Sequence, residues 1–176
     1  MLTVAQEIVI SNFAKLLIAR TTDAIKNKPI PRTSVRYENG SRITTNFSAP
    51  VNSSGSLIRS LSYEITDTHL IINGNDYAYY LIHGRKPTKN SGSGSVKADI
   101  LKWMQEKNIH SSEINDSTLA FLIARKIHRE GSSVWIRNKG ENSGLLTSIV
   151  TDEILDEFNA KFTAQLIKEL KEEFGN

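Results

Sequence analysis

An apolar side chain recurs at every fourth position near the end of this 176-residue chain. The row contains Val150, Ile154, Phe158, Phe162, Leu166, Leu170 and Phe174. This spacing predicts an amphipathic helix from about Leu146 to Phe174, about 40 Å long at 1.5 Å per residue. Because a period of four exceeds 3.6, each step turns the row by about 40° around the helix axis. One flat neighbour cannot cover a row that winds so far. The pattern therefore favours either self-association or coverage of half the row by the N-terminal helix of the same chain.

Helical patterns and turn dipeptides alternate along the first part of the chain. Residues 2–27 have helical apolar spacing and end at a Pro-Ile-Pro segment, residues 29–31, because proline cannot continue the helical hydrogen-bond ladder. Residues 33–38 and 42–47 flank the turn dipeptide Asn39-Gly40. That arrangement predicts a β-hairpin.

A shorter unit of helix, hairpin and helix follows. Residues 56–61 predict a short helix, and residues 63–72 predict a second hairpin around Asp67-Thr68. Asp76 is expected to cap the next segment, residues 77–82, which holds three of the five tyrosines of the chain. Tyrosine is suited both to a core and to an interface, so these side chains are candidates for either.

The remaining segments are a loop, two helices and an irregular stretch. Residues 84–95 are rich in glycine and serine and are too long for a tight turn, so the loop is either functional or disordered. Residues 96–107 and 117–130 predict helices, whereas residues 132–147 predict irregular structure with a short strand at 134–136. Together these elements predict an α+β fold, with a small antiparallel sheet packed with several helices and long N- and C-terminal helices.

Charge divides the chain at the same place as the predicted domains. We expect one α+β domain over residues 1–150 and an extended helix over residues 151–176 that serves as an assembly arm. The net charge is +3, but residues 151–176 hold seven acids against three bases and carry −4, which leaves +7 on residues 1–150. A basic body with an acidic end suits nucleic acid, head-to-tail contact between copies, or a solvated surface of mixed sign.

The sequence lacks the patterns of catalytic and metal sites. The absence of cysteine excludes disulfides, thiolate zinc sites and a cysteine nucleophile. The four histidines have no metal-ligand spacing, and we expect His128, on a predicted helix, to lie at the surface. Nucleophile-elbow and phosphate-loop motifs are also absent. We therefore expect no enzymatic activity, no metal and no cofactor, in a soluble protein made in the cytoplasm without membrane contact.

A helix-turn-helix over residues 96–131 is the main alternative that the residues suggest. Arg125, Lys126 and Arg129 lie on the second predicted helix, as in a recognition helix that enters the major groove of DNA. The connection of about nine residues exceeds the usual 3–4-residue turn. The alternative function is a small DNA-binding regulator.

Three segments resemble tailed-phage neck proteins, the tail-completion or head–tail joining family. They are Gly-Ser-Leu-Ile-Arg-Ser-Leu at residues 55–61, Tyr-Ala-Tyr-Tyr-Leu-Ile-His-Gly at residues 77–84, and the basic helix end Ile-Ala-Arg-Lys-Ile-His-Arg-Glu-Gly at residues 123–131. The resemblance covers roughly residues 53–131. The chain departs from the family pattern at His83 and Arg85, which stand where an acid and a threonine are common. It also lacks the family's Pro-Phe segment and adds a long C-terminal helix.

The resemblance implies a structural subunit that forms a ring in the neck of the virion, with DNA passing through its lumen. The implied partners are copies of the chain, the portal-side adaptor and the tail proteins, and the implied location is the virion, assembled in the host cytoplasm. The candidate interface residues are Tyr77, Tyr79, Tyr80, Arg85, Lys86, Lys89, Phe158, Phe162, Leu166, Leu170 and Phe174. Candidates for non-specific contact with DNA are Arg85, Lys86, Lys89 and Lys97.

Overall fold

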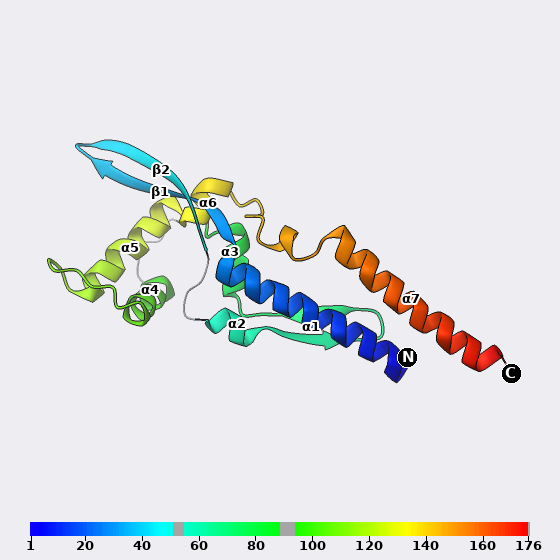
Figure 1. The fold of residues 1–176 in the computed structure, drawn as a ribbon. Coiled ribbons are helices and arrows are strands. Elements are labelled where there is room, and N and C mark those ends of the chain that lie inside the picture. The colour runs from blue at the N-terminus through cyan, green and yellow to red at the C-terminus, as the bar shows by residue number, and fades with distance from the viewer. Residues whose placement is uncertain (51–54, 89–93, 176) are drawn as a thin grey trace.

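The computed structural model describes residues 1–50, 55–88 and 94–175 (Figure 1). The elements in chain order are α1 (Val4–Asn27), β1 (Pro29–Glu38), β2 (Ser41–Pro50), α2 (Ser56–Ser60), β3 (Ser62–Ile65), β4 (Leu70–Asn73), α3 (Tyr77–His83), α4 (Ser95–Glu106), α5 (Asp116–Glu130), α6 (Ser133–Asn138), the 3-10 helix η1 (Leu146–Ser148) and α7 (Asp152–Phe174). The predicted α+β class is confirmed, with long helices near both ends. The strands form two separate antiparallel pairs, β1–β2 and β3–β4.

The β1–β2 pair is a long two-stranded ribbon that projects from the body of the molecule (Figure 1). Its register runs from Pro29 opposite Pro50 to Glu38 opposite Ser41. Asn39 and Gly40 close it with φ values of 51° and 78°, and positive φ at both turn residues matches the right-handed twist of a hairpin. The ribbon is longer than predicted and begins at Pro29, because a strand with a free edge tolerates a residue that has no N–H.

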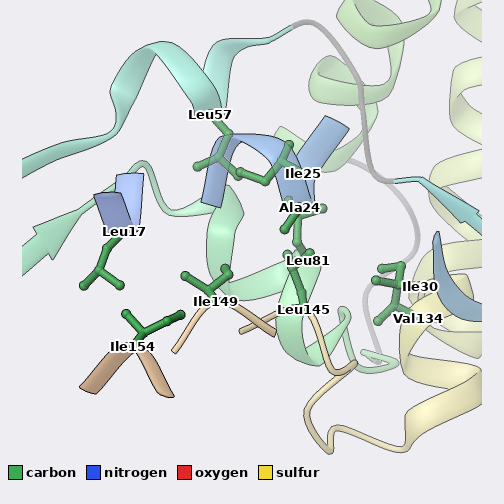
Figure 2. Packing of buried hydrophobic residues seen from close by; sticks show 10 residues of the cluster. All are labelled: Leu17, Ala24, Ile25, Ile30, Leu57, Leu81, Val134, Leu145, Ile149 and Ile154. Carbon is green, nitrogen blue, oxygen red and sulfur yellow. The ribbon is translucent and has the colours of Figure 1, made fainter. Parts of the chain in front are cut away.

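The core lies where α1, the base of the ribbon, α3, α6 and the beginning of α7 meet (Figure 2). Its buried members are Leu17, Ala24, Ile25, Ile30, Leu57, Leu81, Val134, Leu145, Ile149 and Ile154. A capping box formed by Thr3 and Gln6 begins α1. At the other end of the helix, the backbone N–H of Lys28 donates to the Ala24 carbonyl. The predicted end of this helix before the prolines is confirmed.

Two predictions about the second half are wrong. The expected strand at residues 134–136 is part of α6, because the Ser132 hydroxyl caps a helix there by accepting the Trp135 backbone N–H. The expected continuous helix from Leu146 is interrupted, because Thr151 is extended (φ −113°, ψ 162°) and α7 begins only at Asp152. Val150 therefore lies outside the helix, and α7 is about 35 Å long.

The predicted cap of the tyrosine segment also differs in detail. Asp76 precedes α3 but has helical φ and ψ of −56° and −19°, and its side chain makes no capping hydrogen bond. An N-cap residue normally has extended backbone, which directs its side chain toward the free N–H groups. Here the Asn75 carbonyl accepts the Ala78 N–H at 3.0 Å instead.

Candidate assembly surfaces

The three tyrosines of α3 lie outside the core. Tyr77, Tyr79 and Tyr80 are 48%, 62% and 39% exposed, whereas Leu81 on the same helix is buried. Because α3 is short and packs on the core through Ala78 and Leu81, the tyrosines are left on its outer surface. Of the two interpretations open from the sequence, the structure favours surface side chains over core ones.

Tyr79, Tyr80, His83 and Arg85 form a contiguous group, which we call the tyrosine cluster. The Tyr79 ring meets the Tyr80 ring edge-on at 5.8 Å and lies 4.7 Å from the His83 ring. The Arg85 guanidinium is 5.5 Å from the centre of the Tyr80 ring. Aromatic faces beside a cation are typical of protein interfaces, where such side chains combine apolar area with polar edges.

The base of this cluster is fixed by Trp135, whose ring and backbone pack on three glycines. A Cβ atom at Gly84 would lie 2.2 Å from the Trp135 backbone nitrogen, and one at Gly131 or Gly140 would lie 2.5 Å from the Trp135 ring. All three glycines have positive φ. Only glycine fits at such positions, so these three residues allow Trp135 to pack closely against the turn after α3.

Hydrogen bonds across the same junction hold the segment that follows α3. The Arg85 N–H donates to the Ser132 hydroxyl, and the Ser132 N–H donates to the Arg85 carbonyl, both at 2.9 Å. His83 Nδ1 lies 3.0 Å from the Gly140 carbonyl oxygen. These hydrogen bonds tie His83 and Arg85 of the tyrosine cluster to Gly140 and Ser132.

Tyr77 belongs to a different environment from the other two tyrosines. The buried part of its side chain is desolvated, which raises the pKa of Tyr77 above the ordinary 10.0, and the nearby Arg32 guanidinium opposes that rise. Burial also lowers the pKa of Arg32, whose side chain donates to the Pro50 carbonyl at 3.1 Å. Tyr77 thus faces the base of the ribbon, and the structure separates it from the cluster.

The predicted basic loop residues are only partly brought together. Arg85 is half-buried against Tyr80, Lys86 is exposed, and Lys97 lies in the first turn of α4. Lys89 lies outside the described residues. Arg85 is therefore the member of this group that joins the tyrosines.

The expectation that His128 is a surface residue is wrong. The residue is 4% exposed, and its Nδ1 pairs with the Thr88 hydroxyl, while the Thr88 N–H donates to the His128 carbonyl at 2.7 Å. Residues 85–88 therefore run along the end of α5 and cover the imidazole. Sequence reasoning missed this contact because the two partners are forty positions apart.

The α1–α7 pair carries a second candidate surface. The two helices run antiparallel (Figure 1), with Phe13 stacked on Phe158 at 4.3 Å and Phe158 stacked on Phe162 at 5.7 Å. Ile154 is 3% exposed, whereas Leu170 is 53% exposed. The N-terminal helix therefore covers the first half of the apolar row.

The outer half of the row forms what we call the apolar tip, consisting of Leu166, Ile167, Leu170 and Phe174. The exposure of these side chains rises to 75% at Phe174, and a shallow groove is lined by Ile167, Leu170 and Phe174. Val4 and Ile8 at the adjoining end of α1 are 75% and 55% exposed. Exposed apolar patches of this kind mark docking surfaces.

The helix-turn-helix candidate is placed against the ribbon. α4 and α5 pack on each other and are joined by residues 107–115. Lys126 donates to the Val35 carbonyl, and the Arg129 guanidinium lies 5.1 Å over the Tyr37 ring. Arg125 is exposed. Two of the three predicted recognition cations therefore contact the protein itself.

Comparison with known proteins finds no matching protein-family model, no similar curated protein and no similar solved structure. Among residues 1–50, 55–88 and 94–175, no helix is long and apolar enough to cross a membrane. Within the same described part of the chain, no three His, Cys, Asp or Glu side chains are grouped so as to hold a metal ion. The tyrosine cluster and the apolar tip are therefore the features that bear on the function of this chain.

Proposed function

We propose that this chain is a structural virion protein of a tailed bacteriophage, which forms a ring in the neck between the portal-side adaptor and the tail. In this role DNA passes through the lumen of the ring, and the subunit completes or joins the tail without performing a reaction. The observation that carries the proposal is the apolar tip, because its large apolar side chains stay exposed although α1 runs beside α7 as far as Glu169.

A closed ring requires two different surfaces on each subunit, since each copy contacts the next in a head-to-tail manner. The apolar tip and the tyrosine cluster meet this requirement, because they lie on different elements, α7 and α3 (Figure 1). Their charges are opposite in sign, because residues 166–174 hold three acids and two bases, whereas Arg85 and Lys86 adjoin the tyrosines. We therefore assign the tip of one copy to the tyrosine cluster of the next.

The regulator alternative has less support from the contacts. A recognition helix presents its basic side chains to base edges in the major groove. Lys126 and Arg129 are held on the ribbon instead. The alternative predicts that a specific duplex binds at least about 10³-fold more tightly than random DNA, which is the low end for specific binders.

Light scattering of the full chain after gel filtration tests the surface, and electron microscopy of purified virions tests the location. We expect the wild-type chain to self-associate and the double variant Leu170→Glu, Phe174→Glu to be monomeric. The matched control is Asn159→Glu, Thr163→Glu, which adds the same charge at exposed positions of α7. A collar without this polypeptide, or a control that dissociates as fully as the tip variant, contradicts the proposal.

A further inference from the structure

A second basic group lies where the ribbon crosses α5. Arg42 stands opposite Tyr37 in the ribbon, so both side chains leave the same face. The Arg129 guanidinium lies over that same Tyr37 ring at 5.1 Å. Arg125 precedes Arg129 by four residues and leaves the same side of α5. With Lys126, which is tied to β1, these residues form what we call the ribbon–α5 cluster: Arg42, Arg125, Lys126 and Arg129.

Few acids offset this positive charge. Glu130 pairs with Arg129 at 2.5 Å, but its side chain is only 8% exposed, whereas that of Arg129 is 60% exposed. Glu38 pairs with Arg36, and alternation along β1 directs both to the opposite face from Tyr37. β1, β2, α5 and α6 together contain seven bases and three acids.

The chemistry of the surrounding ribbon favours nucleic acid over an acidic protein. Three of the four cations are arginines, whose planar guanidinium matches phosphate oxygens in pairs. On the same face as Arg42, β2 also exposes Thr44 and Asn46, and such side chains hydrogen-bond to phosphates. The core of a protein interface is depleted of charged residues, whereas this surface gathers four cations beside one aromatic ring.

We propose that the ribbon–α5 cluster binds the phosphates of duplex DNA without reading its bases. A projecting two-stranded ribbon fits the duplex, because a β-ribbon is narrow enough to follow its major groove. The inference rests on the proposed function in one respect: the duplex is taken to be the packaged genome that passes through the ring. It places the DNA against β1, β2 and α5, which are different elements from those that carry Arg85, Lys86 and Lys97.

The salt dependence of binding to a random-sequence duplex, followed by fluorescence anisotropy, tests this inference. Because the Lys126 ammonium is held by the Val35 carbonyl, the phosphate contacts come from Arg42, Arg125 and Arg129. Three contacts give a slope of log affinity against log salt of about −2.7, and removing two contacts lowers its magnitude by about 1.8. The test variant is Arg42→Gln, Arg125→Gln, which changes two exposed side chains. The control is Lys168→Gln, Lys171→Gln on α7, which removes the same net charge far from the ribbon.

We expect the slope to fall only in the ribbon variant. The proposal is overturned if both variants change the slope equally, or if the wild-type chain does not bind the duplex at low salt. It is also overturned if polyglutamate competes as well as DNA at equal charge, since the cluster would then recognise acidic protein surfaces. These results are separate from the virion experiment, because a chain found in the collar can fail this assay and a chain absent from the collar can pass it.

Discussion

Replacing Phe158 with alanine should destabilise the whole protein, because this ring joins α7 to α1. Truncating a fully buried phenylalanine to alanine lowers the free energy of unfolding by about 3–5 kcal/mol. Phe158 is half-buried, so the expected loss is about 2 kcal/mol. The stacked contact with Phe13 at 4.3 Å adds about 1 kcal/mol. For a chain of this size, the total of about 3 kcal/mol corresponds to a fall in melting temperature of about 6–12 °C.

Urea unfolding of the single variants Phe13→Ala and Phe158→Ala and of the double variant measures the contact directly. The double-mutant cycle should give a coupling free energy of about 1 kcal/mol. Thr163→Ala is the control on α7, because Thr163 is exposed and lies outside the apolar tip, and its expected change is within about 0.5 kcal/mol. A Phe158→Ala variant with an unchanged midpoint and no coupling to Phe13 would refute the packing of α7 on α1.

Three further predictions concern the supports of the two candidate surfaces. Gly84→Ala should lower the free energy of unfolding in urea by more than about 3 kcal/mol, because its Cβ meets the Trp135 backbone. The control Gly94→Ala has positive φ but open space around its Cβ, and its loss should be about 1 kcal/mol. Equal losses would argue against the clash. Thr88→Val should lower the free energy of unfolding by about 1–3 kcal/mol, because it leaves the buried His128 without its hydroxyl partner. The control Thr163→Val should leave the free energy of unfolding unchanged, and calorimetry measures both variants. Hydrogen bonds from Gln165, Thr3 and Gln6 hold the pKa of Glu169 below its ordinary 4.5, so its stabilising effect is present above pH 4.5 and is lost as the pH falls through the lower folded value. The difference in melting temperature between wild type and Glu169→Gln should therefore shrink on acidification, and a constant difference from pH 7 to pH 3 contradicts this.

Local sequence signals predict the elements whose stability is decided locally. The helix of residues 2–27 ends before its prolines, and the hairpin closes at Asn39-Gly40, because these signals act through the backbone of the residues themselves. The α6 segment contains Val134, Trp135 and Ile136, which favour a strand by composition. Its helix has the Ser132 cap, and the distant Gly84 leaves room for the Trp135 backbone, while the nearby Gly131 and Gly140 leave room for the Trp135 ring.

The candidate surfaces show the same division between local and distant information. Periodicity predicts the apolar row of α7, but only the fold shows that α1 covers the part near Ile154 and leaves the part near Leu170 open. Similarly, the sequence places three bases on one predicted helix, whereas the ribbon that engages Lys126 and Arg129 lies about ninety positions earlier. Contacts between segments so far apart leave no pattern in a single sequence.

The apolar tip is a fixed surface because a polar clamp holds its two helices together. Glu169 accepts hydrogen bonds from Thr3 at 2.7 Å and Gln6 at 2.5 Å on α1, and from Gln165 at 2.8 Å on α7. A helix end that frays would lose these contacts, and its apolar side chains would have no constant arrangement. If packing on α1 were the only role of α7, the apolar row could end at Phe162, where the stacked rings end. The row continues past Phe162 on a helix that hydrogen bonds hold against α1. Less conformational entropy is then lost on docking, as we expect for a stable interface.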